Sequence, residues 1–250
     1  MNVKPIQILL FMVVLLNGSF EIAAQPDEAW ETIFNGKNLD GWSIVDPPVK
    51  AIVEDSSILI HMMPHTSRHS FIRTNRQFED FIFEIDFKRD KLMDSGVMFR
   101  CESTPDSAFS ALFGYMIKID PRPERLWTGG LFVDYGNGYS WIQTLENNEA
   151  ARKAENEEGE WNRLRVEAIG DEIKVWLNEI PTVHVSDNRY KIGYIGLKIH
   201  YLNNNKEENT GLIIAYRNVR IVTENVSEYA RSMTLPILDT SKNSAVKYFR

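Results

Sequence analysis

The chain has 250 residues, and its 28 basic and 35 acidic side chains give a formal net charge of −7 at pH 7. This acidic balance argues against nucleic acid and against an anionic membrane surface as the partner, and the length suits one large domain or two small ones. Cys101 is the single cysteine, so no intrachain disulfide can form, and its place in an apolar strand pattern predicts a core residue rather than a nucleophile.

The N-terminal residues have the layout of a secretory signal peptide. Lys4 comes before an apolar run from Ile8 to Leu16, and the small residues Ala23 and Ala24 follow it. The run is too short to span a membrane as a helix. We therefore expect residues 1–24 to be a signal peptide cleaved near Ala24, the mature protein to be periplasmic or secreted, and no segment to insert in a membrane.

The mature chain opens with a turn-rich stretch and short strands. From Trp30 to Trp42, Asn-Gly and Asp-Gly turns lie among aromatic residues, which predicts a loop held against a core. Period-two alternation then predicts short strands at 51–54, 57–62 and 70–74.

Two longer strands are predicted between Phe78 and Arg100. The first has apolar residues at alternate positions from Phe81 to Phe87, and the second alternates Val97, Phe99 and Cys101 with more polar neighbours. The link RDKLMDSG has the turn residues of a hairpin, so we expect the two strands to pair. If the apolar rows face a core, Glu84, Asp86 and Arg100 share the opposite face, which is either a solvated exterior or a polar cleft.

The rest of the chain continues the pattern of short strands. We predict strands at 114–119, 194–200 and 212–222, a hairpin at 161–181 that turns at Gly170 and Asp171, a loop rich in glycine and aromatic residues at 128–141, and one short exposed helix within 147–159. Alternation places Lys198 and His200 opposite the apolar row of their strand. The tail from Thr223 loses periodicity and is expected to be loose or packed along an edge.

These elements predict an all-β protein. About a dozen short strands with almost no helix are typical of an antiparallel β-sandwich, and a jelly roll is the expected architecture. We expect the sandwich to occupy residues 25–222 and residues 223–250 to form a C-terminal extension.

Two polar patterns suggest sites, but each has a simpler interpretation. Glu84 and Asp86 share a strand face as the carboxylates of retaining glycosidases do, yet Lys88 takes the next acidic position, which favours a solvated face. His61, His65 and His69 recur every four residues, a zinc-binding spacing on a helix, but Pro64 and the strand-like flanks favour a polar loop.

A cluster of aromatic residues lies near the loop at 128–141. Rings at Trp127, Phe132, Tyr135, Tyr139 and Trp141 either stack on the apolar faces of sugar rings or anchor a long loop, and both interpretations stay open.

Eight segments together resemble a known family. They are Phe34–Trp42 (FNGKNLDGW), Asp94–Arg100 (DSGVMFR), Tyr115–Asp120 (YMIKID), Thr128–Gly130 (TGG), Gly159–Arg163 (GEWNR), Val175–Asn178 (VWLN), Gly193–His200 (GYIGLKIH) and Arg217–Ile221 (RNVRI). In this order they resemble the 3-keto-disaccharide hydrolases, which have a concanavalin A-like jelly roll, over about Trp30 to Val222. The resemblance implies an enzyme that cleaves a carbohydrate oxidised at C3, an oxidised disaccharide or other glycoside, by hydrolysis or β-elimination.

The resemblance also implies roles for particular residues. Arg100 would hold an oxyanion or a sugar hydroxyl, and His200 would be either the base or a metal ligand. A divalent metal ion therefore stays open, and no other cofactor is predicted. The substrate-binding residues that we expect are Lys118 and Lys198 on the polar face and Trp127, Tyr135 and Trp141 in the aromatic cluster.

The chain departs from the family pattern at four positions of this face. Met116 stands where the family has glutamate, Lys118 and Lys198 replace glutamines, and Asp94 replaces an asparagine. Either Glu84 or Asp86 compensates as a catalytic carboxylate, or the substrate differs, or the chain is a catalytically weakened carbohydrate-binding β-sandwich.

Overall fold

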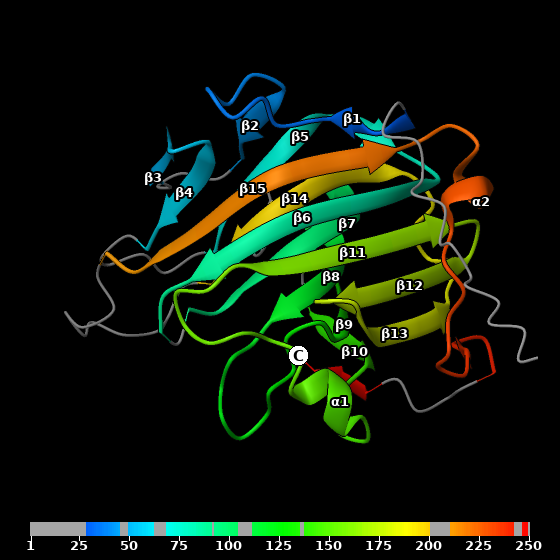
Figure 1. Cartoon of the computed structure of the whole chain (residues 1–250). Coiled ribbons are helices and arrows are strands. Elements are labelled where there is room, and N and C mark those ends of the chain that lie inside the picture. Colours follow the sequence, from blue (N-terminus) through cyan, green and yellow to red (C-terminus); the bar gives the residue numbers. More distant parts are fainter. Residues whose placement is uncertain are drawn as a thin grey trace, which may run out of the picture.

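The computed structural model describes residues 29–45, 50–62, 69–91, 93–104, 112–135, 138–200, 211–242 and 247–249. Two sheets pack face to face, with sheet A in front of sheet B in Figure 1. The pairing is antiparallel throughout except between β13 and β16. The prediction of an all-β antiparallel sandwich of the jelly-roll type is confirmed. The predicted signal peptide and His65 lie outside the described residues.

Each sheet follows one path of neighbouring strands. Sheet A runs in the order β16 (Leu238–Asp239), β13 (Ile180–Ser186), β12 (Glu172–Leu177), β11 (Asn162–Ile169), β6 (Phe81–Arg89), β15 (Ile213–Val222), β4 (Ser57–His61) and β3 (Lys50–Glu54), with β1 (Glu31–Thr32) also paired to β15. Sheet B runs in the order β17 (Lys247–Phe249), β10 (Tyr139–Gln143), β9 (Leu131–Asp134), β8 (Leu112–Ile119), β7 (Ser95–Ser103), β14 (Gly193–Ile199), β5 (Ser70–Phe78) and β2 (Trp42–Ile44).

The core lies between the inner faces of the two sheets. Alternate residues of each strand enter it, for example Leu164 and Val166 on β11 and Ile195 and Leu197 on β14, all of which are buried. The outer face of each sheet, turned away from the core, carries the residues between them. The hairpin at 161–181 is confirmed as β11 and β12, which turn at Gly170 with a φ of +56° that glycine adopts without strain.

One predicted element is wrong in kind, and another is present. The loop at 128–141 contains two paired strands, β9 and β10, because Leu131 and Val133 alternate into the core behind the glycines that suggested a loop. The helix within 147–159 is a single turn, α1 (Glu149–Arg152), whose N-terminus is capped by the side chain of Asn148. The chain leaves the helix so that Glu155 can accept hydrogen bonds from Arg89 and Thr128.

The C-terminal tail packs along sheet edges. It begins with α2 (Val226–Tyr229), which lies beside β6, and then adds β16 to β13 in sheet A. β17 pairs with β10 in sheet B. The tail therefore borders both sheets rather than hanging loose, as the orange and red segment of Figure 1 shows for its first part.

The predicted hairpin between Phe78 and Arg100 is wrong. β6 lies in sheet A between β11 and β15, whereas β7 lies in sheet B between β8 and β14. The link between them crosses from one sheet to the other, and Met93 within it is buried in the core. An alternating pattern shows which residues share a face of a strand, but it does not show which strand is the neighbour. The turn residues in the link are therefore compatible with a connection between sheets as well as with a hairpin.

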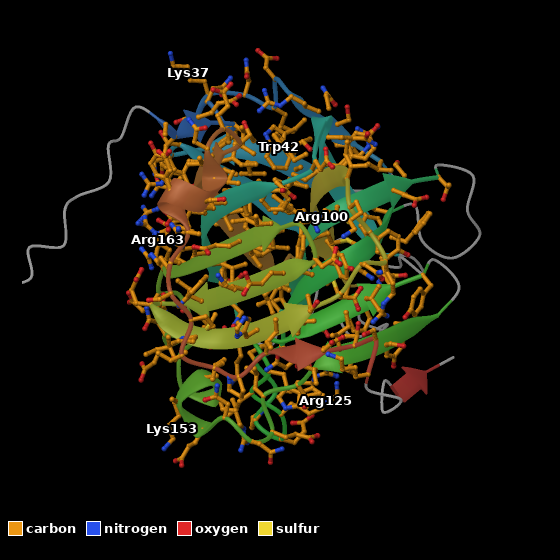
Figure 2. The ribbon with its side chains drawn as sticks, turned by 90° about the vertical axis from the view of Figure 1, so that its right-hand side faces the viewer. Lys37, Trp42, Arg100, Arg125, Lys153 and Arg163 are labelled. Carbon is orange, nitrogen blue, oxygen red and sulfur yellow. The ribbon has the colours of Figure 1, made fainter. Side chains whose placement is uncertain are left out.

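The expected place of Arg100 on an open polar face is also wrong. β7 shifts register between Phe99 and Glu102, and Arg100 has a positive φ of 48°, so its side chain turns toward the end of the sandwich that faces the viewer in Figure 2. There it is fully buried. It donates hydrogen bonds to the backbone carbonyls of Glu79, Ala168, Gly170 and Tyr190 and to the carboxylate of Asp80.

We therefore expect Arg100→Ala to destabilise the fold. Removal of the guanidinium leaves several acceptors at the end of the sandwich without a donor, which costs about 3 kcal/mol or more of the free energy of unfolding. Urea denaturation of the two proteins measures the change. Lys153→Ala, which removes an exposed i,i+4 partner of Glu149, is the control and should cost about 0.5 kcal/mol or less. Equal losses in the two variants would contradict this role for Arg100.

Candidate functional site

Strand alternation in sheet B brings three of the predicted residues together on its outer face. Lys118 comes from β8, Lys198 from β14, and His200 follows the last residue of β14. Their neighbours Ile117 and Ile199 point into the core. His69, just before β5, joins them, and its ring centroid lies 4.2 Å from that of His200.

Both lysines are buried and each is paired with a carboxylate. Lys198 Nζ lies 2.9 Å from Asp134 Oδ2, and Lys118 donates a hydrogen bond to Asp94. Burial lowers the pKa of Lys118 despite the opposing effect of Asp94. Two buried ammonium groups therefore lie beside the histidines, each held in place by its own counter-ion.

The two histidines are kept neutral. Burial, followed by the positive charges of Lys118 and Lys198, holds the pKa of His200 well below its usual range. Burial and the same lysines lower the pKa of His69 to about 3. The Nε2 atom of His200 is buried without a hydrogen-bond partner, and the nearest carboxylate oxygen, Oδ1 of Asp94, is 3.9 Å away. His200 thus offers a neutral imidazole with a lone pair, while the neighbouring lysines reduce its basicity.

Charged residues at the next turn border this cluster. Arg122 Nη2 lies 3.5 Å from Asp94 Oδ2 and also binds the buried carboxylate of Asp120. Burial alone would raise the pKa of Asp120, but Arg122 and Lys118 lower it overall, so this carboxyl stays ionised. Arg122 thereby links the site to the segment that leads into Trp127.

An apolar strip continues the outer face beside the charged groups. It consists of Phe71, Met98, Cys101, Leu112, Met116 and Phe132. Cys101 is buried as predicted, but the register shift of β7 places it in this strip rather than in the main core. Met116 packs over Gly96, where a Cβ would meet its Sδ at 2.5 Å.

Two of the three predicted aromatic ligand-binding residues form a platform at the border of the strip. Trp127 and Trp141 meet edge to face with ring centroids 4.7 Å apart and an interplanar angle of 76°, and Phe132 and Tyr139 extend the group. Tyr139 is 40% exposed. Tyr135 does not join them, since its hydroxyl accepts a hydrogen bond from Arg189 and its ring packs against the main core.

The expectation that Glu84 and Asp86 share a cleft floor with these residues is wrong. Both lie on the outer face of sheet A, on the other side of the core, and both are buried under arginines. Arg165 and Arg220 bind Glu84, and Arg163 binds Asp86. Burial alone would raise the pKa of Glu84, but its arginine hydrogen bonds lower it overall, so it stays ionised and paired.

The predicted metal ligands are divided between the two sheets. His61 ends β4 in sheet A, while His69 lies with His200 in sheet B. Within the part of the chain that the structure describes, no group of three or more histidine, cysteine, aspartate or glutamate side chains is placed to hold a metal ion.

Sequence reasoning missed His69, Asp94 and Asp134 as members of the site. His69 was visible only as part of a histidine repeat, and Asp94 only as a replaced asparagine. Asp134 and Lys198 are 64 positions apart, on strands β9 and β14 that are separated in the sheet by two others, a pairing that no local pattern encodes.

The fold and the site define a jelly-roll sandwich with a histidine–lysine cluster on one sheet face. The chain matches the family described as the 3-keto-alpha-glucoside-1,2-lyase-like domain over residues 29–222, and it belongs to this family of carbohydrate-active domains. No curated protein matches it in sequence. Among the described residues, no helix has the length and apolar character needed to cross a membrane.

Solved structures share the fold at low identity. A protein described as a glycosyl hydrolase from Parabacteroides distasonis has a TM-score of 0.55 at 17% identity, covering 81% of this chain and 99% of its own. The carbohydrate-binding module CBM66 from Bacillus subtilis has a TM-score of 0.50 at 19% identity, covering 72% and 93%. The kappa-carrageenase from Pseudoalteromonas carrageenovora has a TM-score of 0.52 at 10% identity, covering 80% and 97%. Identities this low show the shared fold alone.

We expect the neutral histidines to make stability depend on pH. His69 has a folded pKa of about 3 against its ordinary 6.5, so below pH 6.5 the unfolded chain takes up a proton that the folded protein does not. Stability is then lost as the pH falls, by about 1.4 kcal/mol per pH unit. Urea denaturation at pH 7.5 and pH 5 measures the free energy of unfolding at each pH. The decrease between these two pH values should be about 2 kcal/mol smaller in His69→Gln than in the wild type. The same loss in both proteins would contradict the burial of a neutral His69.

Proposed function

We propose that this domain binds and cleaves a glycoside that carries a ketone at C3, with His200 as the base. Family membership supports the substrate class. The observation that carries the proposal is the neutral imidazole of His200, whose buried Nε2 has no hydrogen-bond partner and lies beside Lys118 and Lys198. The proposal places the reaction on the outer face of sheet B.

The chemistry follows from the ketone. His200 takes the C2 proton, and the electron pair of the C–H bond moves onto the C3 oxygen as an enolate. The ketone then re-forms, the C1–O bond breaks to leave a C1=C2 double bond, and the leaving oxygen takes the proton from the His200 imidazolium. In hydrolysis, water adds to C1 afterwards. Lys118 and Lys198 favour the enolate because their positive charge is already in place when negative charge develops.

The aromatic platform supplies the binding surface. Trp127 and Trp141 border the charged cluster through Arg122 and the apolar strip, and their rings can stack on the apolar face of a sugar. The substrate we propose is an oxidised disaccharide, with the oxidised ring at His200 and the other ring at the platform. The signal peptide predicted at residues 1–24 supports action in the periplasm or outside the cell.

His200→Gln tests the catalytic role. Incubation of the wild type with 3-keto-trehalose should release free sugar, whereas unoxidised trehalose should stay intact because its C2 proton is not acidic. His200→Gln should lower kcat/KM by about a hundredfold or more, since it removes the base. His61→Gln on sheet A is the matched control and should leave the rate unchanged. Sugar release in D2O, followed by proton NMR, also reports exchange at C2, which should disappear only in His200→Gln.

A second candidate function is a binding module without catalysis. Met116 favours it, because a fully buried thioether stands where the family has a carboxylate. Absence of turnover in the wild type together with intact binding of 3-keto-trehalose would decide for this alternative.

Both candidate functions need the aromatic platform. Trp141→Ala should weaken binding of 3-keto-trehalose by about 0.5–1.5 kcal/mol, measured by titration calorimetry in the His200→Gln background so that no turnover intervenes. Trp161→Ala, which removes an indole from the opposite sheet, should leave the affinity unchanged. Equal affinity in Trp141→Ala would rule out the platform as the sugar-binding surface.

A further inference from the structure

A cavity of about 380 Å³ lies on the outer face of sheet A, across the core from the histidine–lysine cluster. Its lining comes from three of the segments that carry the family resemblance. These are the stretch that holds Phe34, Asn35 and Gly36, the stretch that ends at Arg163, and the stretch that holds Asn218 and Arg220. The volume falls at the lower end of the range for small-molecule sites.

A break in sheet A creates the cavity. β15 pairs with β4 as far as Tyr216 and with β1 from Arg220 onward, and Val219 accepts a backbone hydrogen bond from Ile33. Within the described strands, residues 217 and 218 are therefore left without a ladder partner on that side. The pairing of β15 with β6 shifts register over the same residues, and Asn218 has a φ of 51°. Bulges of this kind redirect side chains and are frequent next to binding sites. Here the bulge puts Arg217, Asn218 and Arg220 on one face.

Both charged residues that line the cavity, Arg163 and Arg220, are positive, and they belong to a larger cluster of ion pairs. Four guanidinium groups, those of Arg163, Arg165, Arg217 and Arg220, surround Glu84, Asp86 and Glu167. The cavity thus presents guanidinium groups in a chain whose overall charge is −7. An anion near this surface is therefore attracted to the arginines.

Two of the arginines have N–H groups that are not used in hydrogen bonds within the described residues. Arg163 gives Nε and Nη2 to Asp86, which leaves its Nη1 without an acceptor among the described residues, and its side chain is 43% exposed. It lies at the periphery of the sheet A side in Figure 2. Arg217 stacks 3.8 Å from the ring centroid of Trp161, and its Nε has no hydrogen-bond partner. Stacked and paired guanidinium groups are pre-oriented to bind a carboxylate.

Neutral hydroxyl groups complete the lining. The side chains of Thr32 and Ser56 border the cavity. Such groups suit the hydroxyls of a sugar ring, while the arginines suit a carboxylate on it.

We propose that this cavity is a second binding site, which takes the uronate unit of an acidic saccharide. The carboxylate binds Arg163 with Arg217 near it, and the ring hydroxyls meet Thr32 and Ser56. That the ligand is a saccharide rests on the proposed function, whereas its negative charge follows from the arginines alone. The site holds a polymer on the face opposite the reaction and needs no chemistry of its own.

Titration calorimetry with a galacturonate trimer and the corresponding neutral galactose trimer tests the proposal. The wild type should bind the acidic trimer at least about tenfold more tightly than the neutral trimer. The neutral trimer has no carboxylate and so cannot form the charged hydrogen bond with the arginine. Ser56 lies on an exposed turn, so Ser56→Glu should fold normally and weaken the acidic trimer about tenfold or more by repulsion, while its isostere Ser56→Gln should not. Arg163→Ala should weaken it similarly.

Other outcomes would overturn the proposal. Equal binding of both trimers, or equal affinity in Ser56→Glu and Ser56→Gln, would exclude a uronate site here. Displacement of the trimer by sulfate at equal concentration and ionic strength would reduce the cavity to a general anion site. If His200→Gln no longer binds the acidic trimer, the binding site lies on sheet B instead. Since none of these measurements needs turnover, failure of the proposed reaction leaves their result intact.

Discussion

The guanidinium of Arg100 has no access to water, so its donors must all find acceptors inside the protein. They find them in the turns at one end of the sandwich, which brings the start of β6 and the turn between β11 and β12 together. This is possible only because β7 takes up an extra residue next to Arg100, and that shift moves Cys101 to the outer face. The same crowding demands glycine at 193, since a Cβ there would lie 2.3 Å from the carbonyl carbon of Arg100.

Alternation in the sequence predicted the strands and the faces of Lys118, Lys198 and His200, because a regular strand turns successive side chains to opposite sides. It failed where the chain departs from regularity. The bulge at Arg100 reverses the parity that placed this residue on the substrate side, and the link through Met93 crosses between sheets where a hairpin was expected. The partners Asp94 and Asp134 depend on which strands become neighbours, and that is decided by packing of the whole sandwich.

The two outer faces use charged residues to opposite effect. On sheet A, each carboxylate is surrounded by arginines, so Glu84 remains ionised and cannot supply a proton to a leaving group. On sheet B, each lysine has its own carboxylate, and the summed positive charge acts on the histidines instead. A buried acid among arginines is a structural element, whereas a neutral imidazole among ammonium groups retains a lone pair that can react. This contrast moves the candidate chemistry from the acidic pair to His200.

Met116 takes the position where the sequence comparison expected a glutamate, and a nearby residue supplies a carboxylate instead. Glu84 and Asp86 cannot compensate, because they lie across the core on sheet A. Asp94, which stands where the family has asparagine, places a carboxylate oxygen 3.9 Å from Nε2 of His200 and also binds Lys118. Asp94, which directly precedes β7, thus supplies a carboxylate in place of the glutamate expected on β8. In the reaction we propose, a carboxylate at this position steadies the imidazolium that forms when His200 accepts a proton, and the buried Met116 lies in the apolar strip beside it.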